Sequence, residues 1–398
     1  MTTQALKAPL HMRRNGLDPV EELARAREDE GVVRVETPFG PPAYLICRHE
    51  DVRQVLADPT RFSSALAPLP GSGYVDADEL ERLRAGQLFR LDPPEHSRLR
   101  RMLTPEFTMR RMRGLEPRIT QIVHKALDDL ERAGKPADLV EHFALPVPSL
   151  VICELLGVPY ADRARFQERA VRLLDTSLPM ERRVAAQRED RAYMADLVAR
   201  AQAAPGQDML GMLVREHGDD LSTDELIGIA ELLLLAGHET TSNMLALGTL
   251  ALLRHPDQLA VIRQDPAQAE PAVEELSRWL SVVQSLPPRM TTTDVEIAGQ
   301  VIPSGSLLIC SLPAANRDPA FVHDPETLDV TRAAAGHLAF GHGVHHCLGA
   351  PLARMEMRIA FPALLRRFPG LALADPDEQA DFRIFTTVYG VNALRVTW

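Results

Sequence analysis

The sequence has no apolar run long enough to cross a membrane. The most apolar stretch, Leu226–Gly237, contains Glu231 and is shorter than the ~20 apolar residues that span a bilayer. Residues 1–16 lack the apolar centre of a secretory signal peptide. We therefore expect a cytoplasmic protein with no membrane anchor.

Cysteine and positive charge are also scarce. The four cysteines stand far apart and form no C-x-x-C pair, so they do not make a disulfide framework. Lys and Arg number 44 against 55 Asp and Glu, which leaves a formal net charge of −11. A nucleic-acid-binding domain needs a basic surface. We therefore expect free thiols and no nucleic-acid partner.

The composition is that of an ordinary globular chain, with 45% hydrophobic and 25% charged residues. At roughly 150 residues per domain, the length allows two or three domains. No repeat, low-complexity linker or flexible boundary divides the sequence, however. We therefore expect one domain over residues 1–398.

Helical periodicity dominates residues 94–282, and short strand patterns lie near both ends of the chain. Residues 60–92 are rich in Pro, Gly and Ser and predict an extended loop, a feature that often has a function. The pattern indicates a mainly α protein with small β-sheets (α+β). The shorter predicted elements are strands at Val32–Val35, Ala43–Cys47, Val295–Ile297, Leu307–Cys310, Phe382–Val388 and Val391–Val396, and helices at Asp51–Leu56 and Ala350–Arg367.

The segment from Phe340 to Gly349, Phe-Gly-His-Gly-Val-His-His-Cys-Leu-Gly, is the most informative one. Its glycines permit tight turns and close approach of the backbone to a flat ligand. Ala350 and Pro351 then open a helix, because proline suits a first helical turn. Cys347 thus stands at a helix N-terminus, where the dipole and free N–H groups favour a thiolate. Iron binds cysteine in that anionic form.

This segment resembles the haem-binding loop of the cytochromes P-450 at all the fixed positions of that loop: Phe340, Gly341, Gly343, His345, Cys347 and Gly349. The resemblance implies that family's fold, with a long central helix over the haem, and the activity of a haem-thiolate monooxygenase. Cys347 would be the iron ligand and donate electron density. Heme b (iron protoporphyrin IX) would be the cofactor, bordered by Phe340, Gly341 and Gly349. His346 is a less usual residue that can alter hydrogen bonding near the sulfur.

The same region allows a second interpretation, a zinc site. The possible ligands are His337, His342, His345, His346 and Cys347. Zinc sites normally show paired ligands at set spacings, often with more thiolates. The haem interpretation is preferred, and a haem or zinc protein without enzymatic activity stays as an alternative.

A helical pattern from about Ser222 to Arg254 begins with a capping-box signature and would span ~50 Å. Within it, the sequence Ala-Gly-His-Glu-Thr-Thr at 236–241 predicts a local opening, because threonine hydroxyls compete for backbone carbonyls. This stretch resembles the family's oxygen-activation motif. The resemblance makes Glu239 and Thr240 the catalytic pair, in which Thr240 hydrogen-bonds at the oxygen-binding position and Glu239 relays protons from solvent. Ala236 would contact the haem.

Glu275 and Arg278 are three residues apart and share one helix face. Such pairs are commonly solvated surface charges. Their place, 72 residues before Cys347, resembles the family's Glu-x-x-Arg helix. The resemblance implies a buried structural pair, completed by residues 316–319, that takes no part in catalysis.

A set of cations is suited to the haem propionates. His96 and Arg100 can share a helix face because they are four residues apart, and Arg289 follows a Pro-Pro break. By resemblance, His96, Arg100, Arg289 and His345 would bind the propionates through charge-assisted hydrogen bonds.

Residues 96–118 hold seven arginines against two glutamates. This is either a solvated helix face or a surface that steers an acidic electron donor. Similar members of the family take electrons from a ferredoxin-like protein with its reductase, and no flavin or nicotinamide domain follows here. We expect such a donor to dock near Arg110, Arg111 and Arg113.

By alignment to the family's motifs, the substrate pocket would be lined by Leu232, Leu235, Ala236, Thr240, Ser285, Val388 and Leu88, with Leu66, Leu69 and Phe89 from the long loop at its opening. Mostly aliphatic lining favours an apolar or amphipathic small molecule, such as a polyketide, terpenoid, steroid-like compound or xenobiotic. We expect a monomer that uses O2 to hydroxylate this molecule in secondary metabolism. Epoxidation, dealkylation, aryl coupling and peroxide-driven oxidation are alternatives on the same haem.

Overall fold

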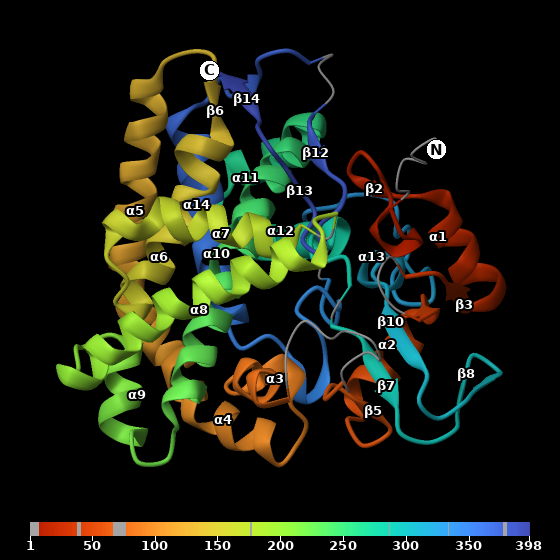
Figure 1. Cartoon of the computed structure of the whole chain (residues 1–398). Helices are drawn as coiled ribbons and strands as arrows, with labels where there is room; N and C mark the ends of the chain where they lie inside the picture. The colour runs from red at the N-terminus through yellow and green to blue at the C-terminus, as the bar shows by residue number, and fades with distance from the viewer. Residues whose placement is uncertain are drawn as a thin grey trace, which may run out of the picture.

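The computed structural model describes residues 8–37, 41–66, 77–175, 177–285, 287–332, 334–376 and 380–398. Long helices fill the left side of Figure 1, and the largest sheet lies with the N-terminal segments on the right. The predicted mainly α class with small sheets is confirmed. The α-helices are α1 (Glu21–Arg25), α2 (His49–Ala57), α3 (Ala77–Arg84), α4 (Glu95–Leu103), α5 (Met109–Ala133), α6 (Pro146–Leu156), α7 (Arg163–Leu174), α8 (Met180–Ala203), α9 (Met209–His217), α10 (Thr223–Arg254), α11 (Pro256–Gln264), α12 (Ala269–Leu280), α13 (Leu312–Ala315) and α14 (Ala350–Arg367).

The strands are short and form small sheets. In chain order they are β1 (Arg14–Asn15), β2 (Asp18–Pro19), β3 (Val32–Val35), β4 (Ala43–Ile46), β5 (Phe62–Ser63), β6 (Ala137–Asp138), β7 (Arg289–Thr291), β8 (Val295–Ile297), β9 (Gln300–Ile302), β10 (Leu307–Cys310), β11 (Ala372–Leu373), β12 (Phe382–Arg383), β13 (Gly390–Val391) and β14 (Arg395–Thr397).

The largest sheet joins the two ends of the chain. Its order is β3-β4-β10-β7-β5, and β4 runs parallel to β10 with Ala43 opposite Leu307 and Ile46 opposite Cys310. A parallel pair requires a long crossover connection. Here helices α2 to α12 lie in that connection, so the strands near residues 45 and 308 tie the first and last thirds of the chain together.

Helix α10 crosses the helical body and packs against α6, α8, α12 and α14. Its start is the predicted capping box: the Ser222 hydroxyl accepts from the Glu225 backbone N–H, and the Glu225 carboxylate accepts from that of Ser222. The helix is continuous through Gly237, so the local opening expected there is wrong. A Cβ on Gly237 would lie 2.7 Å from the Ile152 side chain. The glycine therefore lets α6 pack closely against α10.

Several short elements differ from the sequence prediction. Residues 60–92 contain β5, α3 and a 3-10 turn at Leu88–Arg90, so the extended loop is wrong for these residues. α3 reads Ala-Asp-Glu-Leu-Glu-Arg-Leu-Arg, mostly strong helix formers, but it is too short for a clear period. Residues 67–76, Leu69 included, lie outside the described residues.

Near the C-terminus, the predicted strand Phe382–Val388 shrinks to β12 with isolated bridges at Thr386 and Val388. The predicted Val391–Val396 divides into β13 and β14, which belong to different sheets. Residues 382–397 pair with several different segments, so no single partner strand extends β12 or β13 to the predicted length. In the described part of the chain, no helix is both long and apolar enough to cross a membrane.

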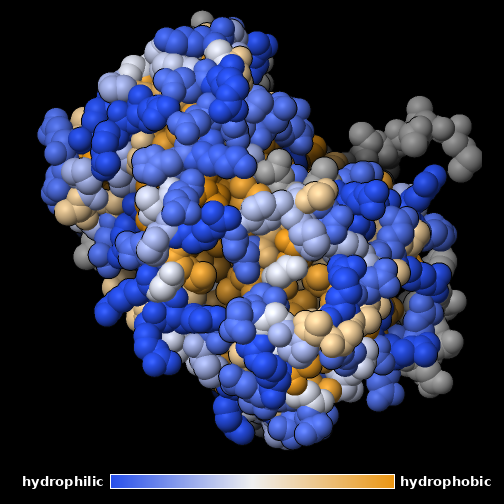
Figure 2. Space-filling model, turned by 90° about the vertical axis from the view of Figure 1, so that its left-hand side faces the viewer, coloured by the Kyte–Doolittle hydropathy of each residue, from blue (hydrophilic) through white to orange (hydrophobic). Residues whose placement is uncertain are grey.

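The core is one large apolar cluster centred on α5, α6, α10 and α14, with smaller clusters around the five-stranded sheet. Figure 2 shows the face that lies to the left in Figure 1: hydrophilic side chains cover most of it, and apolar ones are visible between them near its middle.

Candidate active site

Cys347 lies just before α14, and its thiol meets the start of that helix. The backbone N–H groups of Gly349 and Ala350 donate hydrogen bonds to the sulfur. Surrounding protein atoms raise the pKa of the Cys347 thiol, whereas these N–H groups and the charges of Arg100 and Arg354 lower it. By accessible area Cys347 is nevertheless exposed. This geometry presents a thiolate ligand, supported by a helix N-terminus, to a group held against the loop.

Tight turns hold the cysteine loop. Gly341 and Gly343 have φ of 71° and 69°, values that disfavour other residues. A Cβ on Gly343 would lie 2.4 Å from the Leu56 carbonyl oxygen at the end of α2. The Cys347 N–H donates to the Phe340 carbonyl at 2.8 Å, which closes the loop on itself. No Cβ contact arises within 4 Å at Gly349, which borders open space.

The four predicted propionate ligands converge although they come from separate parts of the chain. The rings of His96 and His345 have centroids 4.3 Å apart, and the His345 imidazole is hydrogen-bonded to Ser64. Burial, followed by the charges of Arg100 and Arg289, lowers the pKa of His96. Burial, Arg289 and His96 lower that of His345 to about 3.

No carboxylate of the described residues forms an ion pair with this cluster, although the charge of Asp92, which is hydrogen-bonded to Ser63 and Ser64, acts on it from a distance. His96 Nδ1 and the Arg289 side chain are buried, and His96 Nδ1 has no hydrogen-bond partner. The Arg100 side chain makes no hydrogen bond or ion pair with any described residue, while its charge reaches Cys347. Two arginines and two imidazoles placed together, with no ion-pair partner among the described residues, fit a dianionic ligand. A haem whose two propionates reach this cluster while its iron faces Cys347 satisfies both requirements.

One face of α10 is open in the middle of an otherwise buried helix. Leu232, Leu235 and Thr240 are half-buried and Ala236 is exposed, although the residues around them are buried. Their spacing of three to four residues places them on a single helix face. The Thr240 hydroxyl donates to the Ala236 carbonyl at 2.9 Å. This face is therefore the part of α10 that is available to a ligand.

Glu239 points away from that open face and is 2% exposed. Its carboxylate lies 3.5 Å from His238 Nε2 on one side and 3.5 Å from the Arg383 guanidinium on the other. Burial alone would raise the pKa of Glu239, but the hydrogen bond and charge of His238 and the charge of Arg383 lower it. Glu239 is consequently an ionised carboxylate inside the protein. Sequence reasoning missed both partners, one of which is 144 positions distant.

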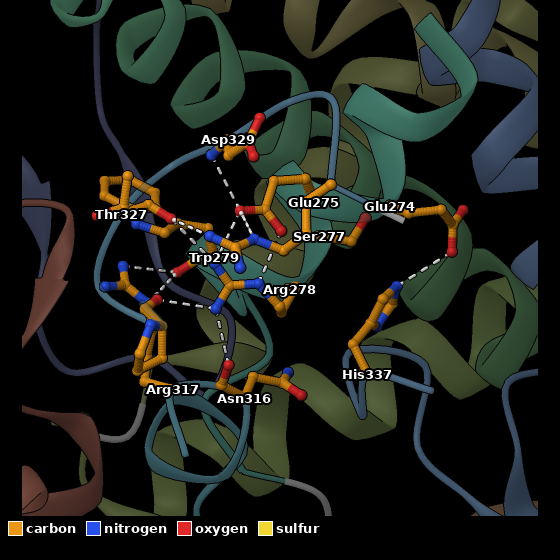
Figure 3. A network of polar contacts seen from close by, with 12 residues as sticks. Glu274, Glu275, Ser277, Arg278, Trp279, Asn316, Arg317, Thr327, Asp329 and His337 are labelled. Atoms are coloured by element: carbon orange, nitrogen blue, oxygen red, sulfur yellow. Dashed lines mark hydrogen bonds and ion pairs between the residues drawn. The ribbon is translucent and has the colours of Figure 1, made fainter. Parts of the chain in front are cut away.

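The Glu275–Arg278 pair is fully buried, with both side chains 0% exposed. Arg278 donates to both Glu275 oxygens, at 2.7 and 2.8 Å, and to the Asn316 carbonyl at 2.9 Å. Arg332 and the Asp329 N–H also bind Glu275. Figure 3 shows this network between α12 and the segment that follows α13. The expected structural contact with residues 316–319 is present.

A second carboxylate on α12 supports the cysteine loop and was not foreseen. Glu274 accepts from Arg354 at 2.7 and 2.8 Å and from His337 at 3.1 Å, the latter contact being visible in Figure 3. Although burial opposes it, the hydrogen bonds from His337 and Arg354 hold the pKa of Glu274 at about 2. The Arg354 guanidinium also stacks over Phe340, 4.2 Å from its ring centroid.

The remaining predicted pocket residues are spread over several segments. Leu88 and Val388 are buried, at 5% and 7% exposure, and Ser285 is half-buried and bridged to Ser311. Of the loop residues, Leu66 and Phe89 are half-buried. His346 is exposed, and no hydrogen bond from its ring to the sulfur is present among the described residues. Nor do these residues contain any group of three His, Cys, Asp or Glu side chains placed to hold a metal ion, as a zinc site requires.

The arginine-rich segment 96–118 is partly neutralised. Three of its arginines form ion pairs: Arg98 with Glu225, Arg111 with Glu106 and Arg118 with Glu154. Arg101, Arg110 and Arg113 are exposed and make no ion pair with the residues that the structure describes. Fewer of these arginines are therefore free to attract an acidic protein than the number in the sequence suggests.

Comparison with known proteins places these features in a family. A cytochrome P450 family profile matches residues 180–382. A protein named cytochrome P450 FAS1 from Rhodococcoides fascians is 56% identical over 98% of both chains.

Two solved structures are also similar. The P450 StaH from biosynthesis of the glycopeptide antibiotic A47934 is 48% identical, with a TM-score of 0.87 over 98% of this chain and 100% of that one. OxyC, a cytochrome P450 implicated in an oxidative C–C coupling reaction during vancomycin biosynthesis, is 40% identical, with a TM-score of 0.87 over 97% and 96% of the two chains. The chain therefore belongs to the cytochrome P450 family, whose members are monooxygenases with haem b as their cofactor.

Proposed function

We propose that this P450 takes electrons from an external ferredoxin-type donor and its reductase, and uses O2 to hydroxylate an apolar or amphipathic small molecule. Three features found in one chain support the proposal. These features are the supported thiol of Cys347, the cluster of arginines and imidazoles at His96, and the open face of α10.

The haem, when bound through Cys347, supplies the activation of O2. His96, Arg100, Arg289 and His345 would hold its propionates, and Arg289 is already oriented by the Pro287 carbonyl, which accepts from it at 2.8 Å. The rigid loop geometry would keep the sulfur in place. Glu274, through Arg354 and Phe340, would brace that loop from behind.

Thr240 and Glu239 would divide proton handling between them. The Thr240 hydroxyl lies on the open face, where it could turn from the Ala236 carbonyl and donate a hydrogen bond on the side that the haem would occupy. The ionised Glu239 can accept a proton and pass it on, which is the role of a general acid–base group. His238 and Arg383 hold the Glu239 carboxylate on the far side of the helix, so it must exchange protons without leaving the interior.

Leu232, Leu235 and Ala236, with Val388 and Leu88 near by, would make the substrate pocket largely aliphatic. Such a pocket selects an apolar or amphipathic substrate and excludes water from the reaction. For electron transfer, Arg110 and Arg113 at the start of α5 would attract an acidic donor, because their charges have no partners among the described residues.

Oxidative coupling is a second candidate. It is favoured by the likeness to OxyC, which is implicated in an oxidative C–C coupling. The substrate, one with aromatic rings, would then lose two hydrogen atoms and gain no oxygen, and O2 with two electrons from the donor and two protons would leave as two molecules of water.

Turnover with 18O2 tests the two reactions. The enzyme is loaded with haem, supplied with a surrogate ferredoxin and reductase, and given candidate substrates selected by their effect on the haem spectrum. One labelled oxygen in the product supports hydroxylation. Loss of two hydrogens without label supports coupling, and absence of O2-dependent product with all substrates contradicts both.

A further inference from the structure

A buried polar chain runs along the contact between α8 and α10, on the side of α10 that faces away from the haem space. On α10 it includes His238 and Glu231, and on α8 it includes Asp190 and Arg191; all except Arg191 are less than 8% exposed. Four charged or titratable groups in a helix contact are costly to bury. Their grouping therefore calls for a role that apolar side chains would not fill.

The hydrogen bonds of His238 define where its protons lie. Its Nδ1 is 2.7 Å from the Leu234 carbonyl oxygen, which can only accept, so Nδ1 carries a proton. Its Nε2 lies 3.5 Å from Glu239 Oε1 and has no hydrogen-bond partner among the described residues. A proton taken up at Nε2 would therefore lie beside the Glu239 carboxylate and could be passed to it.

The other end of the chain leads to solvent. Glu231 accepts from Gln87 at 3.1 Å and from Arg191 at 3.4 Å, and Arg191 also pairs with Asp224. Arg191 and Asp224 line a surface depression of about 340 Å³ between α3, α8 and α10. Arg191 therefore connects Glu231 to the wall of that depression.

Asp190 lies between the two ends. Its charge affects both Glu231 and His238, and Arg169 on α7 holds it at 2.9 Å. Glu231 Oε1, His238 Nε2 and Arg169 Nη2 are buried without hydrogen-bond partners. Internal water is the usual partner of such atoms and conducts protons between side chains. Burial and the charge of Asp190 raise the pKa of Glu231 to about 7, although Arg191 opposes them. A carboxyl with this pKa can both gain and lose a proton near neutral pH.

We infer that His238 is a further relay residue of this enzyme, which passes protons to Glu239 from the chain that begins at the α3–α8–α10 depression. The inference rests on the proposed function, since it explains how Glu239 is reprotonated. In each step a proton on His238 Nε2 moves to Glu239 Oε1. The Nδ1 proton stays in place, in its hydrogen bond to the Leu234 carbonyl. Nε2 then takes the next proton from the Asp190 side. These steps are proton transfers only, and the electrons for O2 reduction come from the donor protein.

The variant His238→Gln distinguishes two roles of His238: a relay that passes protons to Glu239, and a hydrogen-bond partner that only holds Glu239 in place. The glutamine amide can still donate to Glu239, but it cannot release that proton. His238→Asn is the second variant, since its amide can keep the bond to the Leu234 carbonyl. His255→Gln is the matched control: His255 makes the same contact, Nδ1 to the Ala251 carbonyl at 2.8 Å, at the far end of α10.

The experiment uses haem-loaded enzyme with a surrogate ferredoxin and reductase, and O2 as the only oxidant, without organic substrate. NADPH consumption and H2O2 release are measured in H2O and in D2O. In His238→Gln we expect water formation to fall by about tenfold or more, the H2O2 share to rise, and the solvent isotope effect to change. His255→Gln should match the wild type.

A resting-state readout accompanies turnover. His238 lowers the pKa of Glu239, so without it Glu239 should protonate in part. The carboxyl band of Glu239 should then appear in the infrared spectrum of His238→Gln and vanish in His238→Gln/Glu239→Gln. Unchanged oxygen chemistry in both His238 variants, with or without that band, overturns the relay and leaves His238 a fixed partner. Failure of the proposed function is distinct: the wild type would then reduce no O2 with any donor.

Discussion

The Arg383 guanidinium lies 3.5 Å from the Glu239 carboxylate, although 144 positions separate them in the chain. Arg383 comes from β12, whose partner strand β13 packs against α10. Arg383 also donates to the Asn243 side chain one turn along that helix. The C-terminal hairpin therefore adds to the effect of His238 in lowering the pKa of Glu239.

Arg383→Gln should destabilise the protein by about 1 kcal/mol at neutral pH, since a charge-assisted contact is lost. The pKa of Glu239 is lowered from 4.5 in the folded protein, so its contribution is present above pH 4.5 and is lost as the pH falls through the folded value. The difference between variant and wild type should consequently shrink in acid. Urea unfolding at several pH values checks this, and a difference that grows in acid contradicts it.

Cys347→Ala should abolish the red-shifted Soret band that reduced, CO-bound enzyme shows when a thiolate binds the iron. Cys47→Ala is the control, because burial raises the pKa of the Cys47 thiol to about 12 and keeps it inert. The measurement is a difference spectrum after dithionite and CO. Retention of the band in Cys347→Ala would assign the ligand elsewhere.

Glu275→Gln should cost about 3–5 kcal/mol, because Arg278 is then buried without a carboxylate partner. Arg278→Leu should cost less, because Arg332 still pairs with Glu275. The double variant should recover part of the loss. Arg367→Gln, which breaks exposed pairs with Asp128 and Glu131, should cost far less than Glu275→Gln. The unfolding free energies of the four variants relative to the wild type test the comparison. Equal losses at the buried and exposed pairs would count against the network in Figure 3.

Glu274→Gln should destabilise the protein by roughly 2–3 kcal/mol at neutral pH. The pKa of Glu274 falls from 4.5 to about 2 on folding, so the stabilisation is fully present above pH 4.5 and is lost as the pH approaches 2. The control is Glu270→Gln, an exposed residue of the same helix. Denaturant midpoints across this pH range provide the test, and a loss independent of pH would refute the ionic origin.

Arg110→Glu/Arg113→Glu should slow reduction by an acidic ferredoxin about tenfold or more at low salt, with the difference narrowing as salt screens the charges. Arg263→Glu/Arg366→Glu, two exposed arginines outside residues 96–118, is the charge-matched control. Stopped-flow reduction under CO gives the rates. Equal slowing in both double variants would indicate net charge rather than a docking surface.

Local chemistry made much of the fold predictable. The strands Val32–Val35, Val295–Ile297 and Leu307–Cys310 and the helix Ala350–Arg367 are confirmed at both ends, since alternation, helical period and Pro or Gly boundaries all agree there. Short elements such as α3 and β12 were missed or overextended. Their few residues carry too weak a period, and packing against distant segments decides them.

For the site, the sequence by itself determined the residue types and their spacing: the cysteine loop, the Glu239–Thr240 pair and the Glu-x-x-Arg motif, all of which depend on neighbours within a few positions. Only the tertiary structure decided which distant groups face them. It placed Arg383 and His238 on Glu239, Glu274 behind the cysteine loop, and Glu106 on Arg111. The physical reason is that an ion pair acts over a few ångströms in space, whereas spacing along the chain constrains such distances only within a helix turn or a loop.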